Sequence, residues 1–182
     1  MRKVLTIHIE KCLACKSCEI ACAVAHSKSG ALEEALTESP KPQKRVTVEA
    51  VGELAVPLQC RHCEDAPCIL VCPTAALRRH DPEGPVLIEQ DRCIGCKFCL
   101  MVCPFGVIDV SSDGNVIVKC DLCIERTKAG EQPACVEACP TKALKLVGKK
   151  DLAAHKRQLA AKELALSTQH NSAKERQEES AQ

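Results

Sequence analysis

Cysteine provides sixteen of the 182 residues of this chain. The cysteines form four groups of four with none left over: Cys12, Cys15, Cys18 and Cys22; Cys60, Cys63, Cys68 and Cys72; Cys93, Cys96, Cys99 and Cys103; and Cys120, Cys123, Cys135 and Cys139. The first and third groups have the spacing C-x2-C-x2-C-x3-C, and the last three groups each end in Cys-Pro, as in bacterial ferredoxins. The pattern predicts four 4Fe-4S clusters and a role in moving electrons.

The spacing has a physical reason. Cysteines three residues apart in a loop can direct three thiolates at three corners of one cubane cluster while backbone N–H groups approach the sulfurs. In the ferredoxin run the fourth cysteine, on the helix that follows, ligates the other cluster of a pair. Each pair of groups is therefore expected to build two clusters by exchanging their last cysteines.

Disulfides and structural zinc are the alternative uses of so many thiols. Residues 1–10 are short, charged at their start and without a small-residue cleavage site, so we expect a strand there rather than a secretory signal. A reducing cytoplasm then disfavours stable disulfides. Zinc sites also use C-x2-C pairs, but a tetrahedral zinc has no use for a third cysteine followed by a fourth and a proline. A zinc-binding structural or interaction protein is the minor alternative, which iron and sulfide analysis would distinguish.

The composition is typical of a chain organised around metal. Aromatic residues make up 1% of the sequence, as Phe98 and Phe105, so the usual large core side chains are missing. Metal binding supplies much of the folding free energy in such domains, and the apo chain is expected to be largely unfolded. The formal charge of +1 becomes roughly −7 when four oxidised clusters are bound to sixteen thiolates.

Charged and titratable residues near the cysteines have two interpretations each. Lys16 and Lys97, beside ligands, could tune a cluster potential or be solvated loop lysines. His26 and His62 could tune or ligate a cluster, or lie behind the ligands or at the surface. No basic patch interleaved with aromatic residues is present, so nucleic acid is not expected as a partner.

Secondary structure between the cysteine groups is expected to be short. We expect a strand at 4–9, a helix from about 18 to 27, a polar proline-containing stretch at 30–44, a β-hairpin at 45–51 and 54–58 turning at Gly52, a turn at 81–85, a strand at 86–89, and a second hairpin at 107–110 and 116–118. Residues of about 28–58 thus form an insertion between the first two groups. Residues 124–134 are a candidate docking loop.

Related phrases recur along the chain: CPTAAL at 72–77, CPFGVI at 103–108 and CPTKAL at 139–144. The repeats predict an α+β fold of two nested ferredoxin-like modules with pseudo-twofold symmetry, a β-hairpin insertion and a C-terminal helical extension. Residues 1–148 would form the four-cluster domain.

The sequence changes character after this domain. Residues 149–166 are predicted to form a helix, capped by Asp151 and carrying Leu152, Leu159 and Leu166 at seven-residue spacing. Its local net charge of about +3 favours docking onto a partner subunit or a second copy, with packing against its own body as the alternative. Residues 167–182 are expected to be disordered. No hydrophobic run is long enough to span a membrane, so we expect a cytoplasmic protein, associated with membranes only through partners.

Residues 4–148 resemble the four-cluster iron-sulfur subunits of the dimethyl sulfoxide reductase and formate hydrogenlyase type. The resemblance rests on QCRHCEDAPCILVCP (59–73), RCIGCKFCLMVCPFGVI (92–108) and KCDLCIERTKAGEQPACVEACPTKAL (119–144). Within that family, CLACKSCEIACAVAHS (12–27) is most similar to the electron-transfer subunit of nickel carbon monoxide dehydrogenase. The resemblance implies single-electron transfer between a catalytic subunit and a second redox partner, such as a hydrogenase or flavoprotein. The alternative is the iron-sulfur subunit of a molybdenum or tungsten formate dehydrogenase or of a formate-hydrogenase complex.

The resemblance also implies the ligand sets. They are Cys12, Cys15, Cys18 and Cys139; Cys22, Cys120, Cys123 and Cys135; Cys60, Cys63, Cys68 and Cys103; and Cys72, Cys93, Cys96 and Cys99. Every cluster would then have four thiolates, and the sequence has no Ser-His-Asp set, phosphate loop or dinucleotide fingerprint. We therefore expect a non-catalytic subunit, with chemistry at an open iron site as the alternative.

Overall fold

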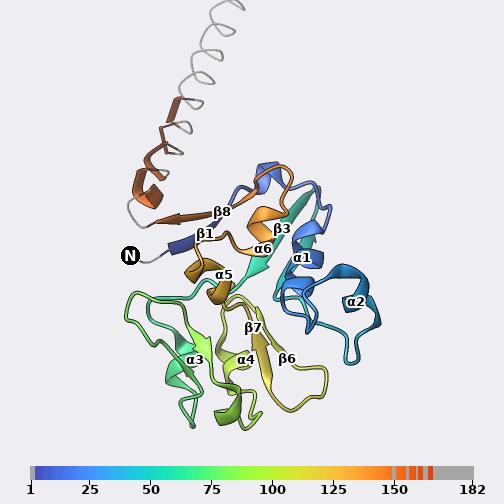
Figure 1. The fold of residues 1–182 in the computed structure, drawn as a ribbon. Helices are drawn as coiled ribbons and strands as arrows, with labels where there is room; N and C mark the ends of the chain where they lie inside the picture. The colour runs from blue at the N-terminus through green and yellow to red at the C-terminus, as the bar shows by residue number, and fades with distance from the viewer. Residues whose placement is uncertain (1–2, 149–150, 155, 159, 162–163, 166–182) are drawn as a thin grey trace, which may run out of the picture. The chain divides into compact units, whose positions relative to one another are not determined.

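The computed structural model describes residues 3–148, 151–154, 156–158, 160–161 and 164–165. The chain divides into two compact units, Met1–Leu146 and Val147–Gln182. In the first unit, short strands and helices alternate with the cysteine loops (Figure 1). The strands are β1 (Lys3–Ile7), β2 (Val46–Val51), β3 (Leu54–Gln59), β4 (Leu77–Arg78), β5 (Leu87–Ile88), β6 (Ile108–Val110), β7 (Ile117–Lys119) and β8 (Leu144–Gly148). The helices are α1 (Ser17–Ala25), α2 (Leu32–Thr37), α3 (Pro67–Leu70), α4 (Phe98–Val102), α5 (Ile124–Lys128) and α6 (Ala134–Glu137), with 3-10 turns at Ile9–Lys11 and Gln90–Arg92.

Within residues 3–148, the strands form four two-stranded sheets, β1–β8, β2–β3, β4–β5 and β6–β7. The β1–β8 pair joins the two ends of the cysteine-bearing region. The His8 N–H donates to the Ala143 carbonyl at 2.8 Å, directly beyond the strand. Because β1 leads into the first cysteine group and β8 follows the fourth, this pair brings those two groups together.

The first hydrophobic core is built from these same groups. Helix α1, which carries Cys18 and Cys22, packs against α6, which carries Cys135. Leu5, Val46, Leu144 and Cys139 also belong to this core. Cysteines thus occupy core positions that large apolar side chains fill in an ordinary domain.

The second and third groups share a separate core. It contains Cys68 and Cys99 with Leu77, Val86 and Ile117. The recurring Cys-Pro phrases contribute their sixth residue to a core each time, as Leu77, Ile108 and Leu144, all buried. Full burial of such a side chain contributes about 1.5–3 kcal/mol to the free energy of unfolding. Each Cys-Pro phrase therefore supplies a fourth cysteine and also anchors the chain that follows it in a core. The pseudo-twofold relation between the two predicted modules remains a proposal.

The predicted hairpins are confirmed. Strands β2 and β3 pair antiparallel from Val46 opposite Gln59 to Val51 opposite Leu54, and β6 pairs antiparallel with β7. The turn between β2 and β3 passes through Gly52 at φ +58°, a conformation that costs glycine little. Helix α2 lies in the polar stretch at 30–44, where we had predicted no element.

The second unit contains helical residues at 151–154, 156–158, 160–161 and 164–165, as expected for the C-terminal helix. Leu164 is exposed. Leu159, Leu166 and the predicted tail at 167–182 lie outside the described residues. Among the described residues, no helix has the length and apolar character needed to cross a membrane.

Candidate metal centres

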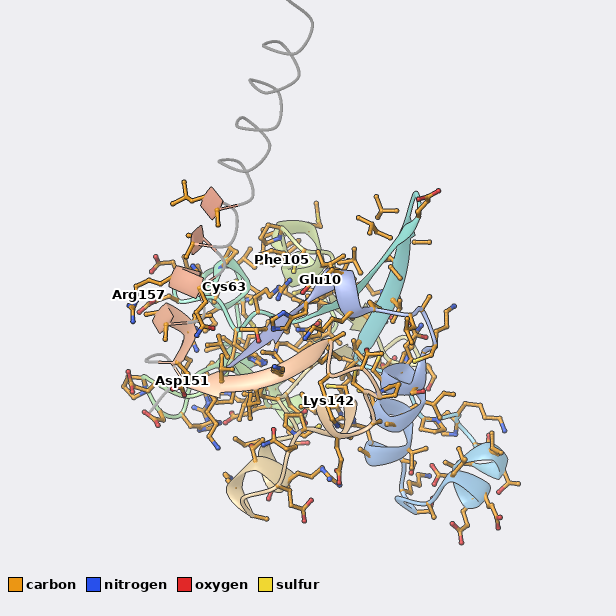
Figure 2. All side chains as sticks on the ribbon, turned by 90° about the horizontal axis from the view of Figure 1, so that it is seen from above. Glu10, Cys63, Phe105, Lys142, Asp151 and Arg157 are labelled. Atoms are coloured by element: carbon orange, nitrogen blue, oxygen red, sulfur yellow. The ribbon has the colours of Figure 1, made fainter. Side chains whose placement is uncertain are left out.

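Two small cavities of the second core are each lined by four cysteines. One is lined by Cys72, Cys93, Cys96 and Cys99. The other is lined by Cys60, Cys63, Cys68 and Cys103, with Phe105 at its wall; Cys63 and Phe105 are labelled in Figure 2. Each cavity therefore combines three cysteines of one group with the last cysteine of the other. The structure brings together the same cysteines that the resemblance assigns to two ligand sets.

The remaining eight cysteines gather around the first core. Burial raises the pKa of the Cys18 thiol to about 11, and the nearby charges of Cys12 and Cys139 add to this effect. Cys139 also acts on the exposed Cys15. Burial raises the pKa of Cys135, and the charges of Cys120, Cys22 and Cys123 raise it further. Cys18, Cys15 and Cys135 are thus each influenced by cysteines of their expected sets, although Cys18 of the first set also acts on Cys135.

Left-handed backbone conformations shape the cysteine loops. Lys16 and Lys97 lie at φ +58° and +62°, each directly before a helix, and Ala14 and Gly95 two residues earlier are also left-handed. A Cβ atom at Gly95 would lie 2.2 Å from the Asn115 carbonyl oxygen, so this position requires glycine.

Helix α1 begins within one residue of the start predicted at about residue 18, and the third cysteine group also carries a helix directly after its loop. The left-handed turn reverses the chain so that α1 starts at Ser17 and α4 at Phe98. The third cysteines, Cys18 and Cys99, therefore already lie on the helix. The prediction of three loop cysteines was wrong in this respect, since only the first two belong to the loop.

The three Cys-Pro phrases repeat a turn as well as a sequence. Their fourth residues, Ala75, Gly106 and Lys142, all have φ between +51° and +59°. After the turn at Lys142, the Ala143 N–H donates to the Cys139 Sγ at 3.2 Å. Such bonds favour the thiolate form and tune a cluster held by it.

Backbone N–H groups also approach cysteines elsewhere. The N–H groups of Arg45, His62 and Leu122 donate to the Sγ atoms of Cys22, Cys60 and Cys120 at 3.2, 3.4 and 3.4 Å. The Arg45 contact comes from the insertion, so this segment supports the first core directly. The sequence carried no signal for that contact, because it depends on how the insertion folds back.

Burial differs between the ligand sets. Cys22, Cys120, Cys123 and Cys135 are all buried, whereas Cys15 and Cys96 are exposed. An exposed aliphatic side chain lies two positions before each exposed cysteine: Leu13 is 69% and Ile94 66% exposed. The sets that contain Cys15 and Cys96 therefore reach the surface through one ligand.

His26 takes part in a polar network beside Cys22. Its Nδ1 donates to the Cys22 carbonyl at 2.7 Å, and its Nε2 lies 3.1 Å from the Asp121 Oδ1. Both acceptors are satisfied only by the doubly protonated ring. Burial lowers the pKa of His26, but the bonds to Asp121 and Cys22 outweigh it and raise the pKa to about 9. His26, Asp121 and Cys123 have potential ligand atoms within 4.8 Å of one another, but His26 uses both ring nitrogens as donors, which leaves neither nitrogen free to bind a metal. A role for His26 in tuning a cluster stays a prediction.

His62 lies between Cys60 and Cys63 and is buried. Burial and the charge of Lys119 lower its pKa to about 3, so the ring is neutral at physiological pH. Its Nδ1 accepts the Val86 N–H at 3.0 Å, which leaves this atom unavailable to a metal. The structure therefore gives His62 a packing and hydrogen-bonding role.

The donor set fits iron–sulfur clusters. All sixteen candidate ligands are thiol sulfurs, and eight of them line two cavities in fours, which is the number of thiolates that a cubane cluster binds. Gln59 adds a second sign: its side chain is 99% buried, and within residues 3–148 neither its Oε1 nor its Nε2 has a hydrogen-bond partner. It lies opposite Val46, whose side chain belongs to the first core. Cluster sulfides would give this amide an acceptor.

Comparison with known proteins places the chain in a family. The 4Fe-4S dicluster domain matches residues 51–149. The chain is 47% identical over 176 residues to an iron-sulfur protein of Rhodospirillum rubrum, covering 88% of this chain and 90% of that protein. It is 39% identical over 158 residues to the putative electron transport protein YsaA of Escherichia coli K12, covering 86% and 96%.

Two further comparisons are more distant. The electron transport protein HydN of Escherichia coli K12 is 35% identical over 167 residues, covering 84% of this chain and 91% of HydN. A chain of the active-site complex BamBC of benzoyl coenzyme A reductase has a TM-score of 0.44 and 23% identity, covering 91% and 95%. The sequence matches alone are decisive: this chain belongs to the 4Fe-4S dicluster-domain family of ferredoxin-type iron-sulfur proteins.

Proposed function

We propose that this protein is a non-catalytic electron-transfer subunit that holds four 4Fe-4S clusters, one in each of the four cysteine sets. The observation that carries the proposal is the pair of cavities in which three cysteines of one group meet the last cysteine of another. This exchange is what two-cluster ferredoxin modules require and what a zinc site does not. Relatives named as electron transport proteins support the same reading.

The burial of the cysteines suggests which clusters exchange electrons with partner proteins and which lie between them. A 4Fe-4S cluster supplies one-electron redox chemistry when bound. The sets that contain Cys15 and Cys96 are open to solvent at one ligand, and the set of Cys22, Cys120, Cys123 and Cys135 is enclosed. The two open sets are the candidate points of electron entry and exit, and the enclosed set and the partly buried set of Cys60, Cys63, Cys68 and Cys103 connect them.

For the partners we favour a nickel carbon monoxide dehydrogenase as the catalytic subunit, with a hydrogenase or flavoprotein as the second redox protein. The support for this choice is the segment at 12–27 and its resemblance to that class of subunit. The alternative is a molybdenum or tungsten formate dehydrogenase or a formate-hydrogenase complex, whose iron-sulfur subunits share the other motifs. The C-terminal helix is a candidate contact with a partner or with a second copy of the chain.

Purification from the native host tests the assignment of partners. A tagged chain is isolated anaerobically, and the proteins and metals that accompany it are identified by mass spectrometry and metal analysis. Recovery of a nickel-containing carbon monoxide dehydrogenase supports the favoured partner; a molybdenum or tungsten enzyme moves the chain to the alternative. The same experiment on a chain lacking residues 149–182 tests the C-terminal helix, because unchanged assembly would exclude it as a contact.

A further inference from the structure

Gln59 and Lys119 occupy the same position in two cysteine groups. Each directly precedes the first cysteine, Cys60 in the second group and Cys120 in the fourth. Both side chains are buried, with exposures of 1% and 2%. Gln59 is neutral and Lys119 is charged. An amide therefore fits at one of these two equivalent buried positions and an ammonium group at the other.

The Lys119 ammonium group joins two cysteine sets. Its Nζ donates to the Cys120 carbonyl at 2.7 Å and to the Val86 carbonyl at 2.5 Å. Cys120 belongs to the enclosed set, and Val86 lines the cavity of Cys60, Cys63, Cys68 and Cys103. The ammonium group is therefore held at the boundary between these two sets.

Within the described residues, the Lys119 ammonium group bonds to carbonyl groups rather than to a carboxylate. In the part of the chain that the structure describes, no ion pair joins it to an acidic side chain, and the nearby Asp121 is engaged by His26 and Arg45. An isolated buried cation is costly, and two carbonyl groups compensate it only in part. The negative charges at this boundary are the thiolates of the two sets, because the Lys119 Nζ bonds to the carbonyl of Cys120 itself and to that of Val86 in the wall of the Cys60 cavity.

We propose that Lys119 is a fixed counter-charge shared by two neighbouring clusters, those held by the Cys60 and the Cys120 sets, and that it raises the reduction potential of both. The inference rests on the proposed four-cluster function. Reduction adds negative charge to a cluster, and a cation held in the low-dielectric interior attracts that charge more strongly than the same cation would across water. The same charge favours electron residence on this pair over the two outer clusters.

The test compares Lys119→Gln, which introduces the residue of the equivalent position, with Lys119→Arg and with the exposed control Lys145→Gln. Each holoprotein is purified anaerobically, its iron and sulfide are measured, and the midpoint potentials are determined by a redox titration followed by electron paramagnetic resonance. We expect Lys119→Gln to lower two of the four potentials, with at least a tenfold lower ratio of reduced to oxidised cluster at a fixed ambient potential. That ratio corresponds to a shift of about 59 mV for a one-electron couple. Lys119→Arg should retain most of the original values and Lys145→Gln all of them.

The outcomes separate this inference from the function on which it rests. Fewer than four clusters in the unaltered protein would refute the proposed function. Four clusters with potentials unchanged in Lys119→Gln, or shifted equally at all four, would overturn the role of Lys119. If Lys119→Gln fails to retain its clusters, the cluster content of Lys119→Arg and Lys119→Met is compared. Retention in Lys119→Arg alone supports a requirement for the charge at this position. Equal loss in both variants overturns that requirement.

Discussion

Arg45 and Asp121, 76 positions apart, form a short ion pair in which the guanidinium Nη1 lies 2.6 Å from the carboxylate Oδ2. Arg45 lies in the insertion, directly before strand β2. Asp121 lies in sequence between two candidate ligands of the fourth group, Cys120 and Cys123. The Arg45 backbone N–H bonds to Cys22 at the same point. This pair therefore links the insertion to the enclosed cysteine set.

Replacing Asp121 with Asn should weaken this link. The variant leaves Arg45 and His26 without their shared anion in a mostly buried setting, and loss of such a charged hydrogen bond costs about 1.5–3 kcal/mol. We expect loss of visible cluster absorbance at lower guanidinium concentration. Glu125→Gln is the matched control, because the Glu125–Lys128 pair is 3.6 Å long and exposed; an equal effect in both variants would count against a structural role for Asp121.

The His26–Asp121 pair should give the stability of the holoprotein a definite pH dependence. The pKa of His26 is raised to about 9 from its ordinary 6.5, while that of Asp121 is lowered, so both are charged at neutral pH. A raised histidine pKa gives a stabilisation that is complete below pH 6.5 and is lost as the pH rises through 9. The guanidinium midpoint of the unaltered protein should exceed that of His26→Gln below pH 6.5, and this difference should shrink as the pH rises through 9. A difference that does not change with pH would contradict the proposed role of the His26–Asp121 pair.

The exchange of cysteines between groups can be tested by whether the iron losses of two cysteine variants add when the variants are combined. Cys72→Ser and Cys93→Ser come from different groups but line one cavity. The double variant should therefore lose no more iron than either single variant, whereas Cys72→Ser with Cys60→Ser should lose two clusters. Iron and sulfide assays of the anaerobically purified variants measure this. Additive loss in the first pair would show that the two cysteines serve different clusters.

Removal of the metal should unfold most of the cysteine-bearing region. Cysteines occupy both cores, including Cys18 and Cys135 in the first and Cys68 and Cys99 in the second, and Cys120 is buried as well. We expect chelation under reducing conditions to abolish most of the far-ultraviolet circular dichroism. Cooperative thermal unfolding of an apo chain with a native-like spectrum would refute this.

The sequence was most informative where chemistry constrains spacing. The four groups and their spacing predicted that each cluster takes its last cysteine from another group, the resemblance to a known family implied which groups pair, and the two strand-like segments on either side of Gly52 predicted the β2–β3 hairpin. These features are local, or repeat a local motif, and so can be read without knowing the fold.

Other elements depended on tertiary structure or on weaker signals. Helix α2 was missed because prolines and polar residues surround it, although LEEALT consists largely of strong helix formers. Strand β8 depends on pairing with β1, more than 130 residues away in sequence. The burial of Lys119 and the network of His26, Asp121 and Arg45 also arise only when distant segments meet, and no local pattern distinguishes these residues from surface charges.

The number and type of metal centres test the account most directly. The anaerobically purified chain is assayed for iron, acid-labile sulfide and zinc, and its clusters are counted by Mössbauer spectroscopy. We predict about sixteen iron and sixteen sulfide per chain, all in 4Fe-4S form. Two clusters per chain, or zinc without sulfide, would contradict a four-cluster electron-transfer subunit.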